Sequence, residues 1–154
     1  MGARFLLCIV LVAGCDDPCE DTARHEMLSV ELGQGLDTFA PLHAGSAPVP
    51  ELGPQGGQHL WLGVRLDEPA PGPVTIELRA DDRACSDCGW VEVGGFARDL
   101  DDPRIGDGPA EWAGLMLVVA RWAADRERRL TAVATDQCDR TGAAEHPVDP
   151  TVQP

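Results

Sequence analysis

Apolar and polar residues alternate strictly in three separate stretches of this chain. The apolar positions are Leu28, Val30 and Leu32 in the first stretch, Leu60, Leu62, Val64 and Leu66 in the second, and Val74, Ile76 and Leu78 in the third. Successive side chains of a β-strand point to opposite faces, so a period of two places each apolar set on one face. The alternation therefore predicts β-strands that are buried on one side and exposed on the other.

Clusters of Gly, Pro and Asp separate the alternating stretches and predict turns. They have the sequences DEPAPGP (67–73), ADDRA (80–84) and DDPRIGDGP (101–109). Such residues interrupt regular structure at the intervals typical of an all-β domain. Between two of these clusters, WVEVGGFA (90–97) predicts a weaker strand that bends at Gly94 and Gly95, because glycine in a strand marks a bend or a bulge.

The stretch EWAGLMLVVARW (111–122) is apolar on both faces, which suits either a helix or a central strand. Its two valines, the polar turn after it and the alternating RLTAVAT (129–135) favour a β-hairpin. A last short strand is expected after Cys138. The count is about seven strands, which predicts an all-β immunoglobulin-like or fibronectin-type β-sandwich over residues 26–149. The antibody Cys…Trp…Cys spacing is absent, and a small barrel stays an alternative.

The first residues have the pattern of an export signal. Arg4 supplies a positive charge, and the nine apolar residues FLLCIVLVA (5–13) follow it. A short charged segment, a short apolar segment and small residues before a cleavage point are typical of a signal peptide. The apolar run is shorter than the roughly 17 to 25 residues that a membrane-spanning helix requires. We therefore expect residues 1–14 to be a signal peptide.

The residues Val12-Ala13-Gly14-Cys15 resemble a bacterial lipobox, the cleavage motif of lipoproteins with type II signal peptides. The resemblance implies that Cys15 is acylated, becomes the first residue of the mature chain and anchors it in the membrane of the cell envelope. Several acyl chains bind a membrane stably, whereas one binds only marginally. Residues 15–25 are then the lipidated cysteine and an acidic tether. Asp16 resembles an inner-membrane retention signal that varies among bacteria, so the choice of membrane stays open.

Four cysteines remain once Cys8 leaves with the signal peptide and Cys15 carries lipid. They are Cys19, Cys85, Cys88 and Cys138. An even number of cysteines in an exported chain predicts disulfides, here two, and four cysteines allow three pairings. We favour Cys85 with Cys88, and Cys19 with Cys138.

The net charge of −14 argues against binding to nucleic acid, whose phosphates require basic surfaces. The same acidity is expected to give a solvated surface and leaves room for a cation or a basic partner. No nucleic-acid partner is therefore expected, and no motif in the sequence indicates a cofactor.

One segment suggests a place where a partner could bind. GPQGGQHLWLGVRL (53–66) is similar to a segment of small β-sandwich lipoproteins of high-GC bacteria, and this resemblance implies no activity. In the alternating pattern, His59, Trp61 and Arg65 share the face opposite the buried leucines. If that face is exposed, Trp61 is a candidate anchor for an envelope protein partner. The alternatives are that a loop covers this face, or that the glycines merely allow the turn.

Motifs for metal binding or catalysis are weak. The four histidines form no metal-binding spacing, the Cys85–Cys88 pair lacks the second pair of a zinc ribbon, and the chain has no Met after Cys138 for blue copper. No serine lies in a nucleophile motif, and no phosphate-binding loop is present. We expect a protein without enzymatic activity. A thiol oxidoreductase that uses Cys85 and Cys88 and a calcium module that uses the acidic turn 99–108 are the alternatives.

Overall fold

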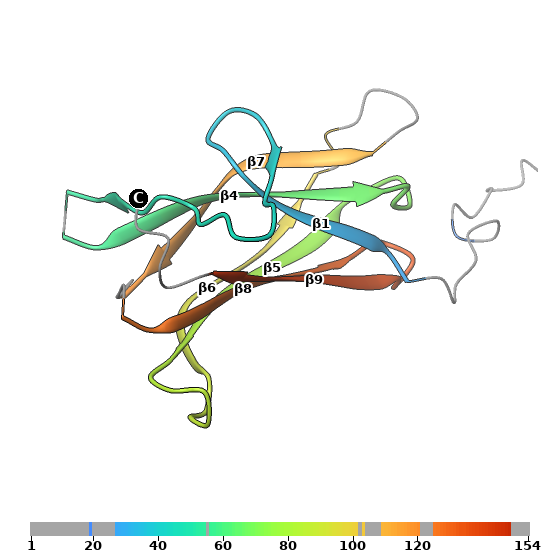
Figure 1. Ribbon diagram of the computed structural model, residues 1–154. Coiled ribbons are helices and arrows are strands. Elements are labelled where there is room, and N and C mark those ends of the chain that lie inside the picture. Colours follow the sequence, from blue (N-terminus) through green and yellow to red (C-terminus); the bar gives the residue numbers. More distant parts are fainter. Residues whose placement is uncertain are drawn as a thin grey trace, which may run out of the picture.

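The computed structural model describes residue 19 and residues 27–54, 56–101, 103, 109–120 and 125–148. Within these residues the chain forms nine β-strands and no helix (Figure 1). Seven strands have six to ten residues: β1 (Ser29–Gln34), β4 (Gln58–Asp67), β5 (Val74–Arg83), β6 (Val91–Leu100), β7 (Ala110–Val119), β8 (Glu127–Thr135) and β9 (Thr141–Val148). The other two, β2 (Ala40–Pro41) and β3 (Glu51–Leu52), have two residues each and were not predicted.

The strands form two antiparallel sheets that face each other (Figure 1). In the five-stranded sheet, β4 pairs with β1 and β3 and also with β7, and β2 extends the sheet beyond β1. The four-stranded sheet has the order β6-β5-β8-β9. This arrangement confirms the prediction of an all-β protein with the layers of a β-sandwich.

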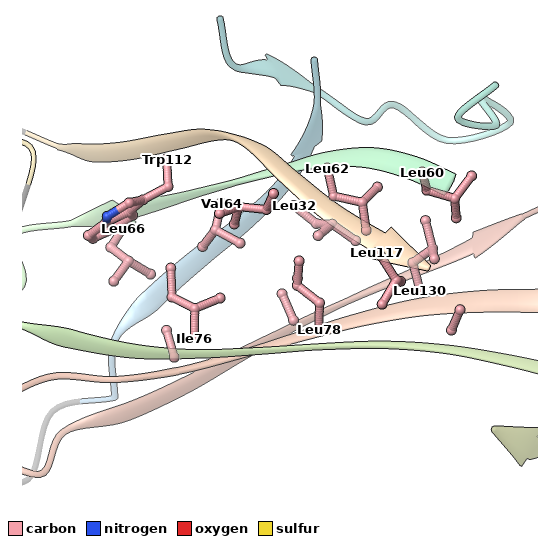
Figure 2. Close-up of a cluster of buried hydrophobic side chains, with 14 of the residues drawn as sticks. Leu32, Leu60, Leu62, Val64, Leu66, Ile76, Leu78, Trp112, Leu117 and Leu130 are labelled. Carbon is pink, nitrogen blue, oxygen red and sulfur yellow. The ribbon is translucent and has the colours of Figure 1, made fainter. Parts of the chain in front are cut away.

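The core lies between the inner faces of the two sheets (Figure 2). Every apolar residue of the alternation in β4 and β5 is fully buried, as are Leu117 of β7 and Leu130 of β8. In Figure 2, Leu60 and Leu62 of β4 face Leu78 of β5 and Leu130 of β8 across the interior. Burying one such side chain contributes about 1.5–3 kcal/mol, so this layer supplies most of the stability of the fold.

Two close backbone contacts join the sheets at opposite corners, and each occurs at a glycine. The Ala120 N–H donates to the Val93 carbonyl over 2.8 Å, and a Cβ on Gly94 would lie only 2.6 Å from the Val118 carbonyl oxygen. At the other corner a Cβ on Gly142 would lie 2.0 Å from the carbonyl oxygen of Leu28. Glycine is required at both corners because no side chain fits between the strands.

The predicted bend in β6 is present, and the predicted hairpin after residue 111 is not. The register between β5 and β6 shifts next to Gly94, where Val93 has no partner in β5, as in a β-bulge. Residues 110–119 and 127–135 are strands, but β7 pairs with β4 while β8 pairs with β5 and β9. The connection between β7 and β8 therefore crosses from one sheet to the other.

The sulfur atoms of Cys19 and Cys138, and those of Cys85 and Cys88, lie at disulfide distance. The Cα atoms are 5.5 and 5.1 Å apart, within the range of a disulfide bond. This pairing is the one that we favoured among the three. Disulfides persist in oxidising compartments, so the protein belongs in an extracytoplasmic environment. Among the residues that the structure describes, no helix is long and apolar enough to cross a membrane.

A buried ion pair holds the β8–β9 turn beside Cys138. The Asp136 carboxylate accepts hydrogen bonds from the backbone N–H groups of Ala70, Cys138 and Arg140 and from the Arg140 guanidinium. Arg140 also donates to the carbonyl of Glu68 over 2.9 Å. Burial alone raises the pKa of Asp136, but these donors outweigh it and hold the pKa below its usual value. The network ties the β8–β9 turn to the β4–β5 turn.

Replacing Asp136 with Ala should lower the free energy of unfolding by about 3–5 kcal/mol, because the Arg140 charge would stay buried without its partner. A carboxyl whose pKa is lowered by folding stabilises the folded state above its unfolded pKa, about 3.9. The stabilisation is lost as the pH falls through the lower, folded-state pKa. Urea unfolding of the wild type and the Asp136→Ala variant between pH 6 and pH 2 would measure both effects. A stability difference that does not shrink in the acid range would contradict this assignment.

Candidate functional site

The outer face of the five-stranded sheet carries the three residues that the sequence singled out. His59, Trp61 and Arg65 all project from β4 on the side opposite its buried residues, as the alternation predicted. Each of the three is partly buried, and each has a specific neighbour. Their surroundings separate them into two structural residues and one candidate contact residue.

Arg65 is part of a closed cluster and offers little to a partner. Its guanidinium lies 4.5 Å from the centre of the Phe39 ring and forms ion pairs with Glu31 and Glu111, each at 2.7 Å. The hydrogen bond to Glu111, and the charges of both carboxylates, raise the pKa of Arg65 despite partial burial. This part of the face is covered by a loop, which is one of the alternatives that the sequence left open.

Two glycines make room for the ring that Arg65 covers. Gly33 of β1 and Gly63 of β4 are opposite each other in the sheet. A Cβ on Gly33 would lie 2.3 Å from the Phe39 ring, and one on Gly63 would lie 2.9 Å from it. The loop from residue 35 to residue 39 can therefore lie flat on the sheet, which explains why a glycine interrupts the apolar run of β4.

His59 lies at the start of β4, next to the turn that precedes this strand. Its Nδ1 is 3.3 Å from the Met116 sulfur, and its ring occupies the space above Gly53, where a Cβ would lie 1.8 Å from Nε2. Gly56 adopts a φ of 79°, which favours glycine, whereas Gly57 has open space around it. The glycines of this turn thus serve local geometry, which is the other alternative that the sequence left open.

Trp61 is the residue of the three that borders an open surface. Its indole N–H donates to Glu51 over 2.9 Å, and its ring lines a groove of about 370 Å³ together with Leu36, Thr38 and Val49. Met116 of β7 lies opposite Trp61 in the sheet. A half-buried tryptophan with one fixed polar end is the type of residue that commonly anchors protein contacts.

Exposed apolar side chains surround Trp61. Four of them are Leu36 (55% exposed), Val49 (59%), Met116 (41%) and Val118 (49%). We call Leu36, Val49, Trp61, Met116 and Val118 the Trp61 patch. Except for Trp61 itself, sequence reasoning missed the patch, because its members come from β7 and from two loops. The one available signal was that residues 111–122 are apolar on both faces, which is unexpected for a strand with only one buried side.

The other chemical candidates can be placed only in part. Cys85 and Cys88 lie in the turn between β5 and β6, where Cys85 is exposed and the disulfide closes the loop. Within the described ranges, no three His, Cys, Asp or Glu side chains converge as a metal site would require. Most of the acidic turn 99–108 lies outside the described residues, as do Cys8, Cys15 and the tail 150–154.

No protein-family model and no curated protein sequence matches this chain.

Replacing Gly33 with Ala should destabilise the fold by about 1–3 kcal/mol, because the added methyl group would displace the Phe39 ring. Thermal and urea unfolding would measure the loss. Gly57→Ala is the matched control, since a Cβ there meets no atom within 4 Å, and its effect should stay within about 0.5 kcal/mol. Equal stability of the two variants would show that the Phe39 ring is not held on the sheet in this way.

Proposed function

We propose that the protein is a lipid-anchored binding module of the bacterial cell envelope, without catalytic activity, that holds an envelope protein through the Trp61 patch. The observation that carries the proposal is the gathering of exposed apolar side chains around a half-buried tryptophan. Contiguous apolar patches on a soluble domain commonly mark interaction sites. Aromatic anchors that become fully desolvated in the complex contribute most of the energy at such interfaces.

Acylation of Cys15 is the proposed means of attachment. It is supported by the lipobox-like residues 12–15 and by the disulfides, which require export. Cys19 follows Cys15 by four residues, a distance that an extended chain covers in about 14 Å. The Cys19–Cys138 bond therefore would hold the β8–β9 turn near the membrane. The Trp61 patch lies toward the opposite ends of the strands, where a partner could reach it.

For the fold type, we propose a fibronectin-type sandwich. Counted along the chain, the first, second and fifth long strands (β1, β4 and β7) share one sheet. The third, fourth, sixth and seventh (β5, β6, β8 and β9) share the other. This division supports the fibronectin-type arrangement among sandwiches of seven strands.

An envelope thiol oxidoreductase is the second candidate. The observation in its favour is that the Cys85–Cys88 pair is at an exposed turn, where a thiol of another protein could reach Cys85. Against it, the pair lies within the turn of a β-hairpin, whereas thioredoxin-like pairs precede a helix in a chain of alternating strands and helices.

Replacing Trp61 with Ala should abolish partner capture and leave the fold intact, because Trp61 lies outside the buried core. Site-specific photocrosslinking from position 116 in the producing cells would measure capture. Val133→Ala is the matched control, because Val133 is a partly exposed apolar residue that faces outward from the other sheet. Capture that survives Trp61→Ala, with an unchanged melting temperature, would exclude the patch as the contact site.

Intact-mass spectrometry of protein extracted from membranes should show a chain that begins at triacylated Cys15. Cys15→Ser should prevent acylation, whereas Cys8→Ser should leave the mature mass unchanged. A mature chain that retains residues 1–14 or carries no acyl group would exclude the anchor. In the same sample, a structural Cys85–Cys88 bond should resist mild reductant, whereas rapid reduction would favour the oxidoreductase.

A further inference from the structure

A second groove lies on the outer face of the four-stranded sheet, beside the β5–β6 turn. It has a volume of about 670 Å³, which is within the range of small-molecule sites. Its walls combine the guanidinium and carboxylate groups of arginines and glutamates with the apolar rings of a tryptophan and a proline. The side chains that matter here are Arg83, Trp90, Glu127, Arg129, Glu145 and Pro147.

The polar groups of this groove are held in place by one another. Two guanidiniums contact the Trp90 ring, that of Arg83 at 4.6 Å and that of Arg129 at 4.5 Å from its centre. Arg83 pairs with Glu127 and also donates to the carbonyl of Ser86, inside the loop that the Cys85–Cys88 disulfide closes. Side chains fixed before a ligand arrives lose little entropy when it binds.

The hydrogen-bonding pattern of the groove disfavours ionic ligands. Three guanidiniums line the groove. Arg83 donates to Glu127, and Arg129 donates to Asp81 and Glu145. The third belongs to the buried Arg128, whose positive charge interacts with the Asp82 carboxylate. An anion would have to displace these carboxylates, and a cation would have to approach the arginines. The groove therefore fits a ligand without net charge.

The same hydrogen bonds leave one carboxylate oxygen of each glutamate able to accept a hydrogen bond from a ligand. Glu127 and Glu145 receive their arginine hydrogen bonds through Oε2 alone. No protein donor in the described part of the chain reaches the Oε1 atom of either residue. A ligand in this groove should thus donate hydrogen bonds to two carboxylates while an apolar face packs on Trp90 and Pro147.

We propose that this groove binds a neutral saccharide. A pyranose ring carries hydroxyl groups that both donate and accept, and it also presents a face of C–H groups to an aromatic or proline ring. Charge-assisted hydrogen bonds from hydroxyls to carboxylates are roughly twice as strong as neutral ones.

The position of the groove suits a glycan in solution. Arg83 and Trp90 lie where β5 ends and β6 begins, and Glu127 and Pro147 lie at the matching ends of β8 and β9. The Cys19–Cys138 bond is at the other end of β8 and β9. Nine residues of β8 separate the two ends by about 30 Å. The assignment does not depend on the Trp61 patch, which lies on the other sheet.

Isothermal titration with neutral tetrasaccharides would test the proposal on the full mature chain. The probes are maltotetraose, cellotetraose, mannotetraose and chitotetraose, with tetragalacturonate and tetraglucosamine as anionic and cationic comparators. We expect saturable binding of at least one neutral probe with a Kd of about 1 mM or tighter, and weaker binding of both charged probes. Failure of all four neutral probes, or tighter binding of a charged one, would overturn the proposal.

Variants would place the binding in this groove. Glu145→Ala and Trp90→Ala should each weaken the affinity at least tenfold. Glu145 is 57% exposed, so its loss should not affect folding. Glu77→Ala is the matched control, because Glu77 is exposed on the same sheet and does not line this groove. If Glu145→Ala binds as tightly as Glu77→Ala, the saccharide does not occupy this groove. If Trp90→Ala fails to fold, Trp90→Phe replaces it and should retain part of the affinity.

Discussion

The contact between the inner faces of the two sheets is the constraint on which the rest of this structure depends. The fully buried side chains of β4, β5, β7 and β8 form one continuous apolar layer. At roughly 25 cal/mol for each Å² of apolar surface removed from water, no single ion pair or disulfide among the described residues contributes as much as the sum of this layer. Because the inner positions are committed to the core, every candidate site in the described residues lies on an outer face or at the end of a strand.

The close backbone contacts between the two sheets determine which of those surfaces remain accessible to a partner. Gly94 and Gly142 allow the edge of one sheet to approach the other, so the edges near these glycines are covered by backbone. Long exposed sheet edges invite aggregation, and natural proteins cover them. With both corners protected, the two broad outer faces are the natural places for recognition. One carries the Trp61 patch and the other carries the arginine-rich groove.

Features that depend on neighbouring residues could be predicted from the sequence. Features that depend on contacts between residues far apart in the chain mostly could not. The alternation in β4 and β5 was predictable, because a period of two is a local property of the chain. The disulfide pairing was a choice among three, and only the fold brings Cys19 beside Cys138. The hairpin prediction for residues 111–135 failed, because local turn signals do not say in which sheet the next strand lies. The role of Arg65 was missed because Phe39, Glu31 and Glu111 come from three other segments.

The sequence by itself determined that the chain forms strands and which of their faces is buried, and it predicted two disulfides. These properties follow from residue spacing and composition, which act over a few residues at a time. Only the tertiary structure decided which strands pair and that β7 joins the sheet of β4. It also decided that the Trp90 ring, just before β6, contacts the guanidiniums of Arg83 in β5 and Arg129 in β8. Such contacts depend on how two sheets pack, and packing is a property of the whole core rather than of any single segment.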